Sequence, residues 1–436
     1  MSKAIFTKQD VLHARPAAVF SSPKTVLSQT FMRQRKIDQE KEMAHCQLVV
    51  QGKQLVLKEQ SDRYMVFITP GIELIIEIHH EFISYIWILS FQATEQNINN
   101  FITTIPDNWL HEFPGKLLNK TCISFENKHQ DDAPVKQLKR IFGDHQLIGN
   151  LVENDSACVW TSFYRDKNTD LLRFYVEDIA LGPRRTGRLA QNLIDLENYR
   201  SMAAIAFPIA EEITFELEDK ELSLAKIIKQ IANASNTLAE KELLRQLLNL
   251  SVISEEWRSK SAHRFSATDA YRKIIEDRLI ELDEKKVLGY QPISKFLIRA
   301  TMPTFRTCDA ANERLNLFIL RIDRAIALLS TRIRVTVEEQ NQALLHSANT
   351  QSKQQMILQE TIEAFSIVAI SYYAGSLIKY LLEALKHSGV AIDPYRWTGI
   401  LLPVIFISTL FSMRFLRKRI SKKLSQLNLS AAKSKR

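Results

Sequence analysis

Two apolar stretches decide the architecture of this chain: IEAFSIVAISYYAGSLIKYLL (362–382) and TGILLPVIFISTLFSMRF (398–415). A bilayer core about 30 Å thick is crossed by about 20 helical residues, and both stretches are close to that length. The second has one charged residue, Arg414, at its end. The first has Glu363 and Lys379 near its two ends, where long side chains reach the interface. The sequence therefore predicts two transmembrane helices, with a buried helical hairpin of a soluble protein as the alternative.

The link between the two stretches is short and has aromatic residues around it. Residues 383–397 join them, and Tyr380, Tyr395 and Trp397 lie at or near its ends. Because Tyr and Trp are enriched at membrane interfaces, this placement favours a transmembrane hairpin in which only the link faces the far side.

The charge distribution gives the hairpin an orientation. The 436 residues include 58 Lys+Arg and 49 Asp+Glu, a net charge of +9, and nine basic residues with no acidic one follow from Arg414 onward. The rest of the chain is therefore formally neutral, which argues against a nucleic-acid partner. Basic residues directly after a spanning helix predict that both termini are cytoplasmic. We expect six of them to contact anionic membrane lipid: Arg414, Arg417, Lys418, Arg419, Lys422 and Lys423.

Signatures of catalysis and metal binding are absent from the sequence. It contains no GxGxxG, GxxxxGK[ST], HExxH or GxSxG motif, and its four cysteines form no CxxC pair. Widely spaced cysteines are typical of buried thiols in a reducing compartment. We therefore expect no enzyme, no catalytic residue, no cofactor and no metal.

Glycine and proline divide the chain, because none of either occurs in 209–288 or 304–374. Their absence favours long helices, whereas the region before them has mixed character. The predicted fold class is α+β. Its four parts are an N-terminal mixed α/β cytoplasmic domain (1–208), a long coiled-coil-like α-helical stalk (209–360), the transmembrane hairpin (361–416) and a basic cytoplasmic tail (417–436).

Within the first part, runs of alternating or β-branched apolar residues predict strands. In 72–79, for example, isoleucine and leucine alternate with Glu73 and Glu77, as a strand with one buried face requires. A helix is expected from Pro183, a residue suited to the first helical position, to about Phe207. The predicted strands are 47–50, 54–57, 63–69, 72–79, 82–91, 121–126, 159–164 and 172–178.

An apolar seam in the stalk indicates helix pairing. Its members recur at a 4-3-4-3-4 spacing, as the a and d positions of a coiled coil do. Beyond them, residues 338–359 are rich in Gln and Asn, and amides at seam positions specify register and oligomeric state. We expect a homo-oligomer formed through the stalk and the first spanning helix. The seam residues are Leu315, Ile319, Ile322, Ile326, Leu329 and Ile333.

Three arginines, Arg184, Arg185 and Arg188, lie in the first turns of the helix that starts at Pro183. Free backbone N–H groups and the positive end of the helix dipole make this position suited to a phosphate or carboxylate. The alternative is a structural one, in which the arginines form salt bridges with the acidic stretch 211–221.

Polar and small residues share one face of the first apolar stretch. Four of them, Glu363, Ser366, Tyr373 and Ser376, fall within about 140° at 100° per residue. Gly375 and Ser376 would let another helix approach closely. Such a face packs against another helix or lines a water-filled path. The residues are Glu363, Ser366, Tyr373, Gly375 and Ser376.

Several strings, in order along the chain, resemble a known family. They are HARP (13–16), VWTSFYRD (159–166), LGPRRTGRLAQNLIDLENYRSMA (181–203), HRFSATDAYRKIIEDRLIEL (263–282), RIRVTVEEQNQALLHS (332–347) and AISYYAGSLIKYL (369–381). Together they resemble the bacterial family of uncharacterised membrane-anchored proteins called domain of unknown function 3422. The resemblance implies a bacterial inner-membrane protein with a cytoplasmic body, and it implies no activity.

A looser resemblance is architectural. A cytoplasmic α/β domain, a helical section, a long helix entering the membrane and a basic tail also describe CorA-type magnesium channels. Those are pentamers whose first spanning helix lines the pore and ends in a Gly-Met-Asn filter. Here the residues around Gly375 read Tyr-Ala-Gly-Ser-Leu, without Met-Asn, which puts divalent-cation transport in doubt.

Two functions follow as expectations. The first is a membrane-anchored scaffold or sensor whose cytoplasmic domain binds a protein partner or an anion. The alternative is a CorA-like oligomeric ion channel or transporter for a divalent cation, with the polar face of the first spanning helix along the path.

Overall fold

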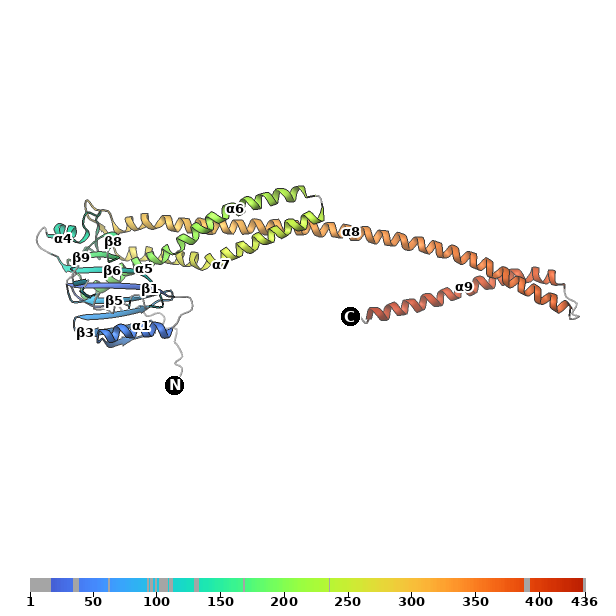
Figure 1. The fold of residues 1–436 in the computed structure, drawn as a ribbon, viewed down its shortest axis with the longest axis horizontal. Helices are drawn as coiled ribbons and strands as arrows, with labels where there is room; N and C mark the ends of the chain where they lie inside the picture. The colour runs from blue at the N-terminus through green and yellow to red at the C-terminus, as the bar shows by residue number, and fades with distance from the viewer. Residues whose placement is uncertain are drawn as a thin grey trace. The chain divides into compact units, whose positions relative to one another are not determined.

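The chain's structure is a computed structural model that describes residues 17–33, 39–61, 63–91, 94, 97–98, 100–101, 109, 113–128, 133–167, 169–234, 236–387 and 393–433. Within these, the side chains of 39, 133–136, 387, 416–418 and 420–433 are not described. The chain forms two compact units, Met1–Leu329 and Ser330–Arg436, which are treated separately below. Figure 1 shows the elements in chain order.

The first unit is built on a ten-stranded sheet with the order β10-β7-β8-β9-β6-β1-β5-β4-β3-β2. β6 and β9 are parallel, and the other neighbouring strands are antiparallel. The strands are β1 (Lys24–Arg33), β2 (Val56–Gln60), β3 (Tyr64–Thr69), β4 (Ile72–Ile78), β5 (Phe82–Leu89), β6 (Gly115–Asn127), β7 (Ile148–Val152), β8 (Ala157–Arg165), β9 (Leu171–Asp178) and β10 (Lys285–Lys286).

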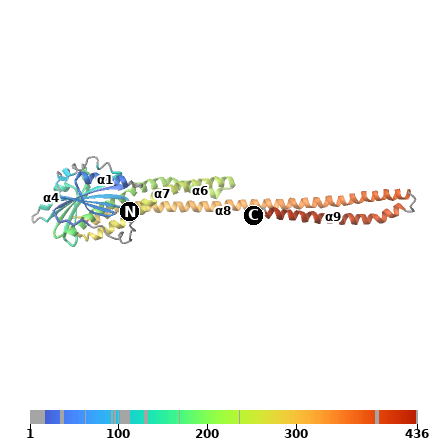
Figure 2. The same cartoon turned by 90° about the horizontal axis from the view of Figure 1, so that it is seen from below.

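Helices cover both faces of the sheet (Figure 2). On one face, α5 (Pro183–Ala204) buries Leu189 and Leu193 against Ile123 and Phe125 of β6, and α7 (Thr237–Glu281) adds its C-terminal part to the same core. On the other face, α1 (Gln39–Gly52) packs against the apolar side chains of β5. A third cluster forms where α4 (Ala133–Phe142) meets β8.

Three helices continue from the sheet as a bundle in which α6 (Ala206–Asn233), α7 and the first part of α8 (Ile293–His387) lie side by side (Figures 1 and 2). Asn236 caps the start of α7, because its side chain accepts a hydrogen bond from the Ala239 N–H at 2.7 Å. Arg314 of α8 donates to Glu221 of α6 at 2.6 Å. The bundle therefore belongs to the same compact unit as the sheet, which extends to Leu329.

The predicted stalk seam is partly correct. Leu315, Ile322 and Leu329 are buried, but Ile319 and Ile326 are only half-buried. Phe318 and Ala325 are the buried residues between these positions. The seam faces α6 and α7 of the same chain, and contact with two helices rather than one shifts the buried face.

The predicted α+β fold class is confirmed, and so is the helix start at Pro183. The largest error is 47–50, predicted as a strand, which lies inside α1. There Cys46 and Val49 are buried three residues apart, a helical spacing, so packing against the sheet overrides the local preference for a strand. β1, which lies at the centre of the sheet between β5 and β6, was not predicted.

Candidate functional site

Two helices of the second unit are long and apolar enough to cross a membrane: α8, and α9 (Pro394–Lys433) over Pro394–Phe415. Only 11% of the most apolar part of α8, and none of that of α9, is buried. A core helix of a soluble protein would be mostly buried, so the burial argues against the alternative of a soluble hairpin. Large apolar side chains such as Phe365 and Phe411 point outward, each 74% exposed.

Small and polar residues form the contact between α8 and α9. The Ser371 and Thr409 hydroxyls are hydrogen-bonded at 2.9 Å, and Ser371 is only 5% exposed. A Cβ added to Gly375 would lie 3.3 Å from Leu402 Cδ1. Small residues at such a contact let two helices approach closely, which is how helices associate where water supplies no driving force.

The five predicted polar-face residues of α8 do not share one surrounding. Gly375 is turned toward α9, and Glu363 lines a cleft with Met413 and Arg414 of α9. Ser366 and Ser376 donate hydrogen bonds to carbonyls of their own helix, those of Ile362 and Tyr372, at 2.8 and 3.0 Å. Tyr373 is 69% exposed. At 100° per residue, Ser366, Tyr373 and Ser376 lie away from the α9 contact.

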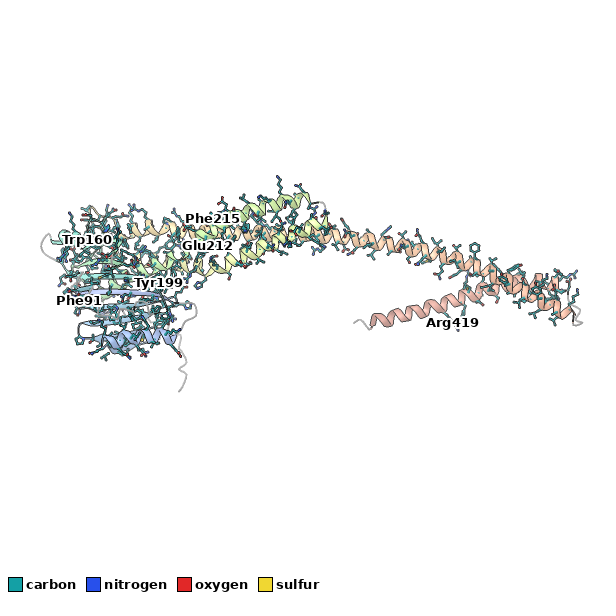
Figure 3. All side chains as sticks on the ribbon, in the orientation of Figure 1. Phe91, Trp160, Tyr199, Glu212, Phe215 and Arg419 are labelled. Atoms are coloured by element: carbon teal, nitrogen blue, oxygen red, sulfur yellow. The ribbon has the colours of Figure 1, made fainter. Side chains whose placement is uncertain are left out.

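The two ends of the hairpin differ. At the linked end, the Lys379 ammonium lies 4.8 Å from the centre of the Tyr395 ring, and Asp393 pairs with Arg396. At the other end the Arg419 guanidinium lies 4.7 Å from the Phe415 ring (Figure 3). Arg414 is also exposed there. The remaining predicted lipid contacts lie within α9, with side chains outside the described part: Arg417, Lys418, Lys422 and Lys423.

The structure separates the three arginines at the start of α5. Arg185 is used internally: its Nη1 donates to Ser156 Oγ at 3.1 Å, and its Nε lies 3.9 Å from Glu153 Oε2. Arg184 and Arg188 are exposed, and neither has an ion pair or side-chain hydrogen bond within the described residues. They are one helical turn apart and lie on the same side of α5.

The alternative given above, in which these arginines form salt bridges with the acidic stretch 211–221, is wrong for the described residues. The acidic stretch 211–221 is engaged by α7 and α8 instead: Glu212 pairs with Lys260 at 2.7 Å, Glu216 accepts from Trp257, and Glu221 pairs with Arg314. Figure 3 shows Glu212 on α6. The start of α5 has no side-chain cap, because Gly182 occupies the capping position. Pro183 has no N–H, and the N–H groups of Arg185 and Thr186 donate to the Gly182 carbonyl at 2.8 and 3.0 Å, so the Arg184 N–H is the one first-turn donor that remains available to an anion among the described residues.

Gly187 has a role that the sequence did not reveal. A Cβ at this position would lie 1.6 Å from the Ala18 carbonyl oxygen, so the chain before β1 crosses α5 in direct contact with the glycine. The Phe20 N–H also donates to the Pro183 carbonyl at 3.3 Å. The close crossing of two backbones therefore explains why residue 187, the second glycine of GPRRTG, is a glycine, independently of any ligand.

A buried polar cluster beneath α5 was also missed. Asn198, 1% exposed, accepts from Thr30 Oγ1 at 2.8 Å and from Asn119 Nδ2 at 2.9 Å, and its Nδ2 donates to Ser84 Oγ at 3.2 Å. Beside it, Glu197 binds Arg165 and Arg200. These contacts join α5 to three central strands, β1, β5 and β6.

A second polar contact joins α7 to the sheet. Glu81, next to β5, accepts from Arg264 at 3.2 Å and from the Tyr271 hydroxyl. Burial, and then this hydrogen bond, raise the pKa of Tyr271, so its hydroxyl stays a donor. Arg278 of α7 pairs with Asp195 of α5 at 3.1 Å. The polar residues of two family-like strings, 181–203 and 263–282, thus hold α5 and α7 in place.

No cluster of three or more metal-ligating side chains occurs in the described part of the chain. All four cysteines are free and buried. Burial raises the pKa of Cys46, Cys122 and Cys308 to about 11 and that of Cys158 to about 12, where Glu177 adds to the effect. At neutral pH all four are protonated thiols, which are poor nucleophiles.

Comparison with known sequences assigns a family. A comparison with curated proteins gives no match. The family described as "Protein of unknown function (DUF3422)" matches residues 8–420. The matched range contains the sheet, the helical bundle and both apolar helices, with HARP (13–16) outside the described residues. Since the match covers nearly the whole chain, this protein belongs to the DUF3422 family of proteins of unknown function.

Proposed function

We propose that the protein is a two-pass scaffold or sensor of the bacterial inner membrane, with both termini in the cytoplasm. The α8–α9 hairpin anchors the chain, and the Met1–Leu329 unit binds an anionic ligand or an anionic site on a cytoplasmic partner. The observation that carries this proposal is the pair Arg184 and Arg188, exposed and unpaired among the described residues, at the uncapped N-terminus of a 22-residue helix.

The positive charges of Arg184 and Arg188 are not compensated by any described acidic group. Arginines in the first helical turns oppose the helix dipole, which costs stability unless an anion compensates. Arg185 has its compensation in Glu153, but Arg184 and Arg188 have none within the described residues. Two guanidinium groups beside the Arg184 N–H match a phosphate or carboxylate, because each guanidinium offers a planar fork of donors.

The membrane part of the proposal rests on the outward apolar surface of α8 and α9 and on the basic residues that follow. Arg414 and Arg419 come directly after the second apolar stretch, where each is worth about 1 kcal/mol against anionic lipid. With these residues on the cytoplasmic side, the sheet unit is on that side too, because the hairpin crosses the membrane twice.

The anion site is tested by titrating the detergent-solubilised full chain with inorganic pyrophosphate and following heat by calorimetry. Arg184→Ala with Arg188→Ala should weaken binding at least tenfold. The matched control is Arg321→Ala with Arg324→Ala, which removes two exposed arginines from the middle of α8. Equal binding by both double variants and the natural chain would leave the arginines without a ligand role.

A second candidate function is ion conduction, favoured by Ser366, Tyr373 and Ser376 on the side of α8 that does not contact α9. If these residues line a path in an oligomer, Ser366→Leu with Tyr373→Leu should reduce Mg²⁺ flux into proteoliposomes. Unchanged flux in this variant, with flux present in the natural chain, would assign conduction elsewhere. Absence of Mg²⁺ flux in the natural chain would exclude Mg²⁺ conduction and leave the scaffold or sensor function as the proposal.

A further inference from the structure

Residues 330–362 of α8, called here the bare segment, are not covered by any other described part of the chain. None is buried, and all are exposed except Ile333 and Thr336, which are half-buried. The exposed residues include large apolar ones, among them Leu344 at 68%, Leu358 at 61% and Ile362 at 57%. The helix nevertheless continues without interruption from Ile293 to His387.

A bare helix of this kind needs a partner. Isolated helices are marginal in water, and most helical stability in proteins comes from packing one face. No glycine or proline in the bare segment weakens it, but its exposed leucines and isoleucines supply no stability while they face water. Nothing in the described part of the chain supplies that cover.

Four exposed apolar residues of the bare segment, Val335, Leu345, Met356 and Ile357, lie about 100° or more away from the centre of one face that carries a regular series of apolar and amide residues. The residues of this face recur at a spacing of 4-3-4-4-3-4-3-4. This is the pattern of a coiled-coil seam with one irregularity, the two successive spacings of four that end at Ala348. Each position is apolar or an amide. The seam consists of Ile333, Val337, Gln340, Leu344, Ala348, Gln351, Gln355, Leu358 and Ile362.

The charged residues confirm that this face is distinct. At 100° per residue, every one of them lies about 80° or more from the centre of the seam. A helix designed only for solvent would carry charges all round. The six charged residues of the bare segment are Arg332, Arg334, Glu338, Glu339, Lys353 and Glu360.

α9 does not occupy the continuation of this seam. Ser371 and Gly375, which contact α9, lie on the opposite side of α8 at 100° per residue. The residues that continue the seam into the apolar stretch are Ala369, Tyr373, Ser376 and Tyr380. Tyr373 and Tyr380 are 69% and 70% exposed. The hairpin therefore leaves the seam open.

We propose that the occupant is the same segment of another copy of this chain, in a parallel, in-register coiled coil. The seam is complementary to itself: its apolar residues face apolar residues, and its amides face amides, without like charges in contact. Gln340, Gln351 and Gln355 hydrogen-bond across the seam and fix its register, as polar residues at such positions do. The parallel direction rests on the proposed membrane anchorage, and the pairing itself does not.

Two adjacent leucines provide the test. Leu344 lies on the seam and Leu345 lies about 100° away, yet their exposed fractions are 68% and 70%. Lysates of cells making Leu344→Cys, Leu345→Cys or Leu358→Cys, with their membranes still present, are oxidised with copper phenanthroline. The natural cysteines are all buried, so they give little background.

Leu344→Cys and Leu358→Cys should both form disulfide-linked dimers at least tenfold faster than Leu345→Cys. Because both substitutions lie on the seam but 14 residues apart, an antiparallel pairing would link at most one of them to itself. Equal rates at all three positions, or no dimer at either seam position, would overturn the proposal.

Membrane sedimentation of the same samples separates this inference from the proposed function. Chain that sediments with the membrane but forms no seam disulfide overturns the seam and leaves the anchorage. Chain that stays soluble but still links through Leu344→Cys overturns the anchorage and leaves the pairing. Leu344→Asp should also reduce the oligomeric mass in detergent, whereas Leu345→Asp should not; equal masses would overturn the proposal.

Discussion

The two units of this protein treat their apolar and charged residues in opposite ways. In Met1–Leu329, apolar side chains fill cores on both faces of the sheet and charged residues are paired across elements, as Arg278 and Asp195 are. In Ser330–Arg436, apolar side chains face outward, and the buried contact is a narrow strip around Ser371 and Gly375. The first unit completes its own interior, and the second requires surroundings that the chain does not supply.

This difference in where the apolar side chains lie indicates which surroundings suit each unit. A hydrogen-bonded polar cluster such as that at Asn198 is strengthened by being shielded from solvent, which suits the interior of a protein in water. An outward apolar surface joined by small residues suits lipid, because lipid removes the cost of exposure. The bare segment belongs to neither class, and the proposed pairing with another copy of the chain would cover its seam.

The largest expected effect comes from breaking the interior of the first unit at Asn198. Asn198→Ala leaves the Thr30, Ser84 and Asn119 side chains short of partners, so we expect a loss of about 3–4 kcal/mol in the free energy of unfolding. The measurement is denaturant unfolding of the full chain in detergent, followed by tryptophan fluorescence. Asn349→Ala, at an exposed helical position, is the control and should change stability by less than about 0.5 kcal/mol. Similar losses in the free energy of unfolding for Asn198→Ala and Asn349→Ala would contradict the difference between a buried and an exposed asparagine.

A charge placed on the outward surface of α9 probes the second unit. Ile407 is 63% exposed within the apolar stretch, and Ile407→Arg should oppose membrane insertion by about 2.5–3.5 kcal/mol. The membrane-bound fraction, measured by sedimentation, should fall. Leu222 of α6 is 59% exposed, and Leu222→Arg should leave that fraction unchanged. A fall for both, or for neither, would contradict the assignment of different solvents.

Thiol chemistry tests how completely the first unit closes. With a pKa raised by burial from 9.0 to about 11, Cys46, Cys122 and Cys308 hold about a hundredfold less thiolate near pH 8 than unperturbed thiols. Reaction with a chromogenic disulfide should therefore be at least a hundredfold slower in the folded chain than in guanidinium. An added Leu345→Cys should react at the fast rate, and fast reaction of the natural thiols would show an open interior.

The same pKa values set a dependence of stability on pH. Above pH 9 the unfolded chain releases thiol protons that the folded chain retains, so the unfolded state binds fewer protons and stability falls as pH rises from 9 to about 11. Unfolding midpoints that rise over this range would contradict the burial of the thiols.

The smallest effect concerns the strip between α8 and α9. Gly375→Leu places atoms where Leu402 already packs, and we expect a loss of about 1–2 kcal/mol, seen as a lower thermal midpoint of Trp397 fluorescence in detergent. Gly399→Leu is the matched control, because a Cβ at Gly399 meets nothing within 4 Å. A larger effect at Gly399 would show that the helices pack through another face.

Local signals predicted the parts of the fold that are locally determined. The start of α5 at Pro183, the strand at Ile72–Ile78 and the two apolar helices follow from proline geometry, from alternation and from length. The strand β1 was missed because its partners, β5 and β6, are distant in sequence and only their pairing places it at the centre of the sheet. The stretch 47–50 was misassigned because packing against the sheet, not its apolar composition, decides its helix.

The candidate sites show the same limit. Arg184, Arg185 and Arg188 were recognisable as a group, but the division between them depends on Glu153, which approaches from the turn between β7 and β8. The role of Gly187 depends on Ala18 crossing α5, and no spacing in the sequence indicates such a contact. The open seam of α8 could be read only after the burial of its neighbours was known.

The central claim is that the hairpin crosses a membrane twice, so that its link lies opposite the sheet unit. It is tested by labelling single cysteines in intact bacteria with a membrane-impermeant maleimide after permeabilising the outer membrane alone. Asp393→Cys, in the link, should be labelled at once. Glu218→Cys on α6 and Arg419→Cys on α9 should be labelled only after the inner membrane is broken. Labelling of all three under the same condition, before or after that step, would contradict the account.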